Sequence, residues 1–212
     1  MYYFIRHGKL DLPYKNHEDM PFEVLADLAS GKLSPLIDKD YTLSLLPKLS
    51  ENVPFKKLEA VYSSPAERCR DTGRLIIENK LGENKNVPEI NILPELIEAS
   101  FDLRKIYETP PTRIDIVEVN RRVLTAIFSG QGAESFQHAY ERVDRVFKII
   151  GEKPQKETLL ITHDFFMRVI EIYIRNKGNR SAIAYEDLAQ TQRNGYLCGF
   201  STDSSLSTFH GL

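Results

Sequence analysis

The stretch Tyr2–Gly8, with the sequence YYFIRHG, joins a short apolar run to an arginine, a histidine and a glycine. The run lacks strict alternation of apolar and polar residues, which is typical of a strand buried on both faces of a parallel sheet. Leu58–Tyr62 and Thr158–Ile161 have the same character. Because segments of helical periodicity separate these runs, the sequence predicts an α/β fold with a mostly parallel central sheet.

Four longer segments have the apolar spacing of helices. In Glu134–Ile150 the apolar positions recur every three or four residues and form one stripe, and Gly151 is expected to cap the end. The other helices are expected at Pro65–Lys80, Ile116–Phe128 and Asp164–Asn176, and two further strands at Val87–Leu93 and Gly195–Ser201.

The segment from Lys9 to Phe55 has no motif that identifies a ligand. We expect a short amphipathic helix at Phe22–Ala29, and a second helix near Ser44–Ser50 with Pro47 in its first turn, where proline is tolerated. The sequence contains no repeat, low-complexity tract or Pro/Gly-rich linker. We therefore expect a single domain over residues 1–212, with an elaborated loop and helical segment at 9–55.

Composition excludes several classes of protein. The 212 residues include 28 Lys and Arg against 30 Asp and Glu, a net charge of −2, which disfavours a nucleic-acid binder that works by bulk charge. Only Cys69 and Cys198 are present, without a CxxC motif, so neither a disulfide scaffold nor a thiolate zinc site is expected. No apolar run is long enough to cross a membrane. We expect a cytoplasmic protein that binds neither nucleic acid nor membrane; the sequence does not indicate its oligomeric state.

Cationic and imidazole side chains follow three of the expected strands. Arg6 and His7 follow the first strand, and Thr162 and His163 end the strand near residue 160. After Leu58–Tyr62, we expect Ser64 to cap a helix in whose first turn Arg68 lies. Any one of these signals suits an ordinary strand end. Together, at the carboxyl edge of one sheet, they predict a pocket for a dianion.

The ordered set Arg6-His7-Gly8, Ser63-Ser64-Pro65-x-x-Arg68 and Thr162-His163 resembles the histidine phosphatase superfamily, also called the phosphoglycerate mutase-like fold. The resemblance implies a three-layer α/β/α sandwich. It implies that His7 is the nucleophile, that Arg6, Arg68 and His163 hold the phosphoryl oxygens, and that His163 also takes part in catalysis. These cationic groups take the place of Mg²⁺, so neither a metal nor another cofactor is implied.

The resemblance also implies a glutamate that protonates the leaving alcohol. The sequence offers two candidates, Glu95 and Glu98. The frame Leu96–Phe101, with the sequence LIEASF, matches the family pattern of Leu-x-Glu followed by Phe, and this favours Glu98. In the alternative interpretation, both are solvated loop carboxylates without a catalytic role.

Several residues depart from the family pattern or carry no function. Lys9–Pro13 lacks the Ser and Asn that contact substrate in the mutases, which disfavours mutase activity. Asp164 stands where glycine is frequent; its side chain either points away from the phosphate or tunes His163. The acidic turn His17–Asp19 is expected to be a solvated loop and not a metal site. Lys9, Lys15 and Arg104 are candidates to flank the crevice.

The resemblance therefore implies a metal-independent, histidine acid phosphatase-type phosphomonoesterase. It would hydrolyse a small phosphorylated substrate through a phosphohistidine, with His7, Glu98 and His163 as catalytic residues and Arg6, Arg68 and His163 as phosphate ligands. Two alternatives stay open: phosphoglycerate mutase-type phosphoryl transfer, and a catalytically silent phosphate-binding regulatory module.

Overall fold

The computed structural model describes residues 1–80, 88–152, 157–179, 185–191 and 194–212. Within them, one sheet has the strand order β3-β2-β4-β1-β5-β6. The strands span Tyr2–Arg6 (β1), Ala60–Ser63 (β2), Ile90–Ile92 (β3), Thr158–Thr162 (β4), Gly199–Thr202 (β5) and His210–Gly211 (β6). Strands β1 to β4 pair in parallel, whereas β5 runs antiparallel to β1 and β6 antiparallel to β5. The expectation of a mostly parallel α/β sheet is confirmed.

Both faces of the sheet are covered, which explains the lack of alternation in its central strands. Every residue of β1, β2 and β4 is buried. Side chains of a strand point alternately to opposite faces, so Tyr2 and Phe4 enter one apolar cluster and Tyr3 and Ile5 the other. The chain thus forms the three layers that the sequence resemblance implies.

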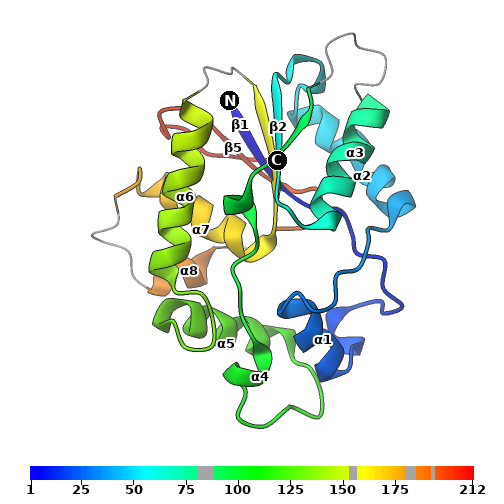
Figure 1. Cartoon of the computed structure of the whole chain (residues 1–212), viewed down its shortest axis with the longest axis vertical. Coiled ribbons are helices and arrows are strands. Elements are labelled where there is room, and N and C mark those ends of the chain that lie inside the picture. The colour runs from blue at the N-terminus through cyan, green and yellow to red at the C-terminus, as the bar shows by residue number, and fades with distance from the viewer. Residues whose placement is uncertain (81–87, 153–156, 180–184, 192–193) are drawn as a thin grey trace.

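Two groups of helices make the outer layers (Figure 1). Helices α2 (Lys39–Asn52) and α3 (Glu67–Lys80) contribute to the cluster on one face of the sheet. The other face packs against α6 (Phe136–Gly151) and α7 (Asp164–Arg175), with α8 (Tyr185–Gln190) beside α7. Helix α7 is buried along most of its length because the sheet and α6 cover it from two sides.

A third group of helices lies beyond the end toward which β1 runs (Figure 1). It consists of α1 (Phe22–Ala29), α4 (Leu103–Ile106) and α5 (Ile116–Ser129), and α4 contacts both of the others. Single 3₁₀ turns occur at His17–Asp19 (η1), Phe55–Lys57 (η2) and Pro94–Leu96 (η3). These helices face the carboxyl edge of the sheet, where a ligand site is expected in this class of fold.

The helix around Pro47 is longer than the sequence suggested. Helix α2 begins at Lys39 after Asp38, whose Oδ1 accepts a hydrogen bond from the Tyr41 amide at 3.0 Å. Pro47 therefore lies in the helix interior and not in the first turn. Its ring nitrogen cannot donate to the carbonyl four residues earlier, a cost that apolar packing of Leu46 and Leu49 offsets.

Other boundaries also differ from the sequence expectations: the strand expected at Gly195–Ser201 is β5, which begins only at Gly199 and ends at Thr202. Helix α3 begins at Glu67 and not at Pro65; Ser64 Oγ accepts a hydrogen bond from the Ala66 amide at 3.3 Å and also contacts His163. Gly151 is the last residue of α6 and does not cap it; Glu152 follows in a right-handed conformation. The strand expected at Val87–Leu93 is the shorter β3, with residue 87 outside the described part of the chain.

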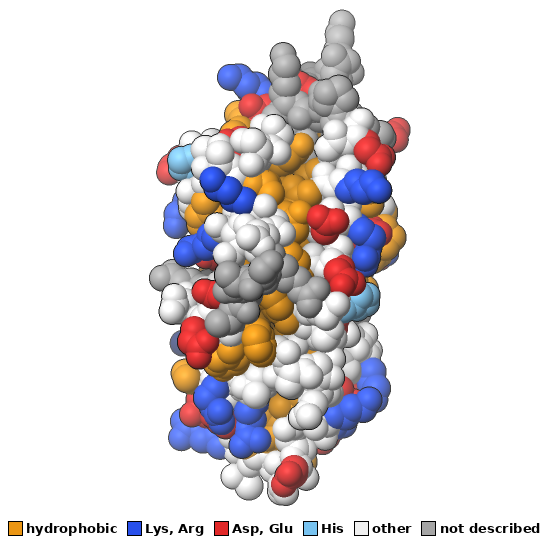
Figure 2. Space-filling view, turned by 90° about the vertical axis from the view of Figure 1, so that its left-hand side faces the viewer, with side chains coloured by type: hydrophobic (Ala, Val, Ile, Leu, Met, Phe, Trp, Pro, Cys, Tyr) orange, Lys and Arg blue, Asp and Glu red, His pale blue; other side chains and the backbone are white. Residues whose placement is uncertain are grey.

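The face of the molecule in Figure 2 carries hydrophobic side chains between lysine, arginine, aspartate and glutamate groups of mixed sign. This mixture agrees with the net charge of −2. Among the helices of the described residues, none combines the length and apolar character needed to cross a membrane.

Candidate active site

Strand register brings the three sequence motifs together. Arg6 of β1 pairs with Thr162 of β4, and the His7 amide donates to the Thr162 carbonyl at 3.0 Å. On the other side of β4, the Ser64 amide donates to the Ile161 carbonyl at 3.0 Å. The residues that follow β1, β2 and β4 are therefore neighbours at one edge of the sheet, as predicted.

His7 is buried and held in one orientation. Its Nδ1 lies 2.8 Å from the Gly8 carbonyl oxygen, which can only accept, so Nδ1 carries the proton and donates it. In the neutral ring, Nε2 then keeps its lone pair. Burial, and next the charges of Arg6 and Arg68, hold the pKa of His7 well below its usual value. The ring is therefore uncharged at neutral pH, as a nucleophile requires.

Gly8 is required by the close approach of α2. A Cβ atom at this position would lie 2.5 Å from Thr42 Oγ1. The Gly8 amide also donates to Thr72 Oγ1 of α3 at 2.9 Å. These contacts fix the peptide whose carbonyl orients His7.

Arg6 is held by a part of the chain that the sequence motifs did not include. Its Nη1 donates to the Asn194 carbonyl at 2.8 Å, and its guanidinium carbon lies 4.4 Å from the centre of the Tyr196 ring. Its Nε is buried and has no hydrogen-bond partner among the described residues. Asn194 and Tyr196 lie in a segment without a recognisable motif, and only the folded chain places them here.

His163 contacts two residues of the second motif. Arg68 Nη2 donates to Nδ1 at 3.1 Å, so Nε2 carries the proton and donates to Ser64 Oγ at 2.8 Å. The ring centre lies 5.3 Å from that of His7. Burial, and next the charges of Arg68 and His7, hold the pKa of His163 well below its usual value. Ser64 thus contacts His163 where a regular helix cap was expected.

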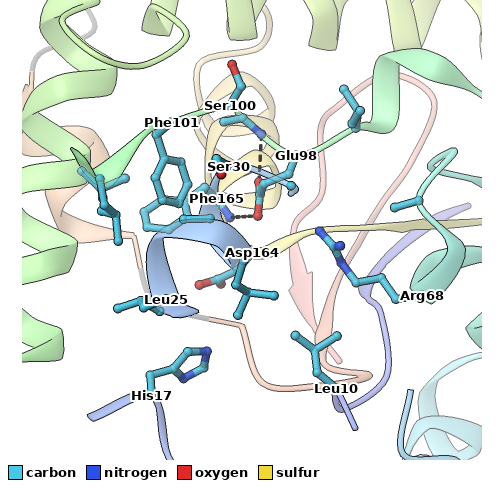
Figure 3. Close-up of a pocket in the computed structure, with 18 of the residues that line it drawn as sticks. Leu10, His17, Leu25, Ser30, Arg68, Glu98, Ser100, Phe101, Asp164 and Phe165 are labelled. Atoms are coloured by element: carbon cyan, nitrogen blue, oxygen red, sulfur yellow. Dashed lines mark hydrogen bonds between the residues drawn. The ribbon is translucent and has the colours of Figure 1, made fainter. Parts of the chain in front are cut away.

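A cavity of about 410 Å³ opens beside these residues (Figure 3). Arg6, His7, Arg68 and Glu98 line it, whereas His163 does not and contacts Arg68. Helices α1 and α5 contribute the wall opposite the sheet. The segment 9–55, which had no readable motif, supplies much of this wall.

Of the two candidate glutamates, only Glu98 lines the cavity. Its Oε1 accepts hydrogen bonds from the Ala99 and Phe166 amides, each at 2.9 Å. Burial, and to a smaller extent the charge of Asp164, raise the pKa of Glu98 to about 7. Glu98 can therefore hold a proton at neutral pH, which a general acid requires.

A buried ion pair fixes the loop that carries Glu98. Arg142 of α6 donates from Nη1 to the Glu95 and Ile97 carbonyls at 2.8 Å and 2.7 Å. Its Nη2 pairs with Glu134 at 2.7 Å, and both side chains are 7% exposed. The Arg142 guanidinium also lies over the Phe166 ring, at 4.1 Å from its centre. In the sequence, Arg142 directly precedes Val143, which belongs to the apolar stripe of this helix. That neighbour is the only sequence feature that indicates burial of Arg142, and nothing in the sequence indicates its contacts with the Glu98 loop.

Asp164 lines the cavity, which excludes the interpretation that its side chain points away from the site. Its Oδ1 accepts a hydrogen bond from the Asn194 amide at 2.7 Å, so the side chain does not point away from the site. Its charge acts on Glu98, whose pKa it raises.

Cys69, Lys9 and Arg104 do not line the cavity. Cys69 is fully buried, with Sγ 3.5 Å from His163 Nε2, and burial raises its pKa to about 12. Lys9 pairs with Asp38 at 3.4 Å and Arg104 with Asp27 at 2.9 Å, and neither lines the cavity. In the described residues, no group of three or more His, Cys, Asp and Glu side chains could hold a metal ion.

Comparison with known proteins identifies the family. The α-ribazole phosphatase of Shigella flexneri has 16% identical residues and a TM-score of 0.62 over 100% of this chain and 94% of that one. YhfR of Bacillus stearothermophilus has 18% identity and a TM-score of 0.60 over 99% and 94% of the two chains. A mycobacterial glucosyl-3-phosphoglycerate phosphatase has 12% identity and a TM-score of 0.60 over 99% of this chain and 94% of that one. At these identities the likeness shows a shared fold.

The sequence itself gives a match at the level of the family. No curated protein matches it significantly. The family model described as the histidine phosphatase superfamily, branch 1, matches residues 42–193. This region contains Arg68, Glu98 and His163 but begins after Arg6 and His7, whose assignment therefore depends on geometry. The chain belongs to the histidine phosphatase superfamily.

Proposed function

We propose that this protein is a metal-independent, histidine acid phosphatase-type phosphomonoesterase that forms a phosphohistidine at His7. One observation carries the proposal: a neutral imidazole with its Nδ1 proton engaged by Gly8 lines the same cavity as two arginines and a carboxyl group. The lone pair of Nε2 is the nucleophile, and the arginines supply positive charge for the phosphoryl oxygens.

In the first step, Nε2 of His7 attacks the phosphorus of the substrate. The N–P bond forms as the bond from phosphorus to the ester oxygen breaks, and protonated Glu98 gives its proton to the departing alkoxide. Arg6 and Arg68 stabilise the negative charge on the phosphoryl oxygens as it redistributes.

In the second step, water attacks the phosphohistidine and Glu98, now a carboxylate, accepts its proton. Inorganic phosphate leaves, and the Nε2 lone pair of His7 and the proton of Glu98 are both restored. His163, expected from the sequence to bind phosphate directly, would instead support both steps by holding Arg68 through Nδ1, while its Nε2 donates to Ser64.

Hydrolysis of p-nitrophenyl phosphate in the presence of EDTA tests the proposal. We expect phosphate release to continue in EDTA and His7→Ala to abolish it. A wild-type protein that binds phosphate without turnover would support the silent regulatory module. Turnover of 3-phosphoglycerate to its 2-isomer in a coupled assay would support the mutase-type alternative.

The proton donor is tested by comparing Glu98→Gln with Glu95→Gln. A general acid contributes about 10²- to 10⁴-fold, and matters most for a poor leaving group. We expect Glu98→Gln to lower kcat/KM for an alkyl phosphate by about this factor, and much less for p-nitrophenyl phosphate. Glu95→Gln is the matched control. Equal losses for both variants and both substrates would remove Glu98 from this role.

A further inference from the structure

The cavity has two chemically different ends. In Figure 3, Arg68 lies on one side, Phe101, Phe165 and Leu25 lie on the other, and Glu98 and Asp164 lie between. The Phe101 and Phe165 rings contact each other edge to face with centres 5.1 Å apart. The cationic end suits a phosphoryl group, so the apolar end receives what the phosphate is attached to.

Buried aliphatic side chains complete the apolar end. Leu25 comes from α1, Leu103 from α4, and Val119 and Val123 from α5; all four are buried and all line the cavity. Polar lining residues such as Ser30, Ser34 and Ser100 are instead exposed, at the rim. Asn120 and His17 are partly buried polar lining residues, so a hydroxyl-rich leaving group would lose hydration along most of this wall and regain few hydrogen bonds, which is unfavourable.

The same end offers no permanent positive charge. Among the described residues, the lysines and arginines that line the cavity are Arg6 and Arg68, both beside His7. Arg104, on α4 below the wall, is engaged by Glu23 and Asp27 and does not line the cavity. A leaving group with a carboxylate or a second phosphate would meet no counter-charge there.

We propose that the substrates are phosphomonoesters with an uncharged apolar leaving group, an aryl or branched-alkyl alcohol that packs between α1, α5 and the Phe101–Phe165 pair. This inference depends on the proposed phosphatase activity and specifies the substrate for it. A volume of about 410 Å³ accommodates a group of this kind together with the phosphate.

Alkyl phosphates that differ only at their far end test the inference without changing the reactivity of the ester. Across the series from ethyl to hexyl phosphate, we expect kcat/KM to rise about three- to fourfold per methylene, the factor that burial of one CH₂ gives. 5-Carboxypentyl phosphate has the same chain and an equally basic leaving oxygen, and should be a poorer substrate than hexyl phosphate by at least tenfold.

A matched pair of variants on α5 places a new charge inside or outside the cavity. Asn120→Lys introduces a cation at a partly buried lining position, whereas Val117→Lys introduces one at a position that is 73% exposed and outside the cavity. We expect Asn120→Lys to reverse or abolish the preference for hexyl over 5-carboxypentyl phosphate. Val117→Lys should leave both that preference and the turnover of ethyl phosphate unchanged.

The outcomes separate this inference from the proposed function. Turnover of ethyl and hexyl phosphates at equal kcat/KM, or a preference for the carboxylated ester or sugar phosphates, would overturn the apolar leaving group and leave the phosphatase standing. A preference ratio that Val117→Lys changes as much as Asn120→Lys would also overturn it. Failure to hydrolyse every ester would overturn both.

Discussion

At the scale of single residues, the charge of Asp164 affects the protonation of the neighbouring Glu98 carboxyl group. Glu98 accepts amide hydrogen bonds, which favour its charged form, yet burial and the charge of Asp164 outweigh them and raise its pKa to about 7. Asp164, the first residue of α7, accepts a hydrogen bond from the Asn194 amide. Asp164 thereby helps to keep a proton on Glu98 near neutral pH.

This pair predicts the pH dependence of catalysis. The proposed acid is protonated below its pKa, so for alkyl phosphates kcat/KM should fall as the pH rises through about 7. His7, whose pKa is lowered, stays unprotonated and active well below pH 6.5. Asp164→Asn removes a charge that raises the pKa of Glu98, so the alkaline limb should move to lower pH. An unchanged limb in a pH–rate profile of this variant would contradict the pairing.

Gly8 supplies a second prediction at this scale. Gly8→Ala would place a methyl group 2.5 Å from Thr42 Oγ1, and overpacking of this kind costs about 1–3 kcal/mol of folding free energy. We expect kcat to fall as well, because the Gly8 carbonyl orients His7. The double variant Gly8→Ala/Thr42→Ala should recover most of the stability in urea denaturation. An additive double variant would show that Thr42 is not the obstacle.

At the scale of elements, the register of β1, β2 and β4 assembles the candidate site, and α6 fixes the loop that carries the proposed proton donor. The buried Arg142–Glu134 pair joins α6 to the carbonyls of Glu95 and Ile97. The amides at the start of α7 then hold Glu98 itself. The proposed acid is thus positioned by two helices and contributed by a loop.

Arg142→Met tests this arrangement. It leaves the buried Glu134 carboxylate with only the exposed His138 ring, at 3.1 Å, beside it among the described residues, and the loss of one member of a buried pair costs about 3–5 kcal/mol. Since the loop loses its anchor, turnover of alkyl phosphates should fall more than turnover of p-nitrophenyl phosphate. The double variant Arg142→Met/Glu134→Leu should regain stability but not the activity on alkyl phosphates. Recovery of both would show that the pair serves folding alone.

The elements also show where sequence reasoning succeeds and where it stops. Apolar runs and stripes indicate which residues are buried, so the central strands and the long helices were predictable. Because the central strands pair in parallel, their carboxyl ends lie at one edge of the sheet. Three features depend on partners distant in sequence: the position of Pro47 in a helix interior, the hydrogen bond between Ser64 and His163, and the burial of Arg142. Local propensity contains no information about such partners.

At the scale of the whole molecule, the candidate site combines residues from both ends of the chain. The cation–π contact between Arg6 and Tyr196 joins the first strand to the segment before β5. Helix α1, which belongs to the segment 9–55 without a motif, contributes one wall of the cavity. The net charge of −2 gives no indication of this site, because two arginines converge with two buried, uncharged histidines in one place. His7, Arg6, Arg68 and Glu98 were predictable as site residues from the resemblance; the apolar wall required the fold.

Covalent trapping of the intermediate tests the central claim most directly. Enzyme mixed with p-nitrophenyl phosphate, quenched within the first turnover and digested, should yield one peptide with a phosphoryl group on His7, stable in alkali and labile in acid. His7→Ala should yield none. Turnover by His7→Ala, or a wild-type phosphoryl group on His163 or any other residue, would contradict the account.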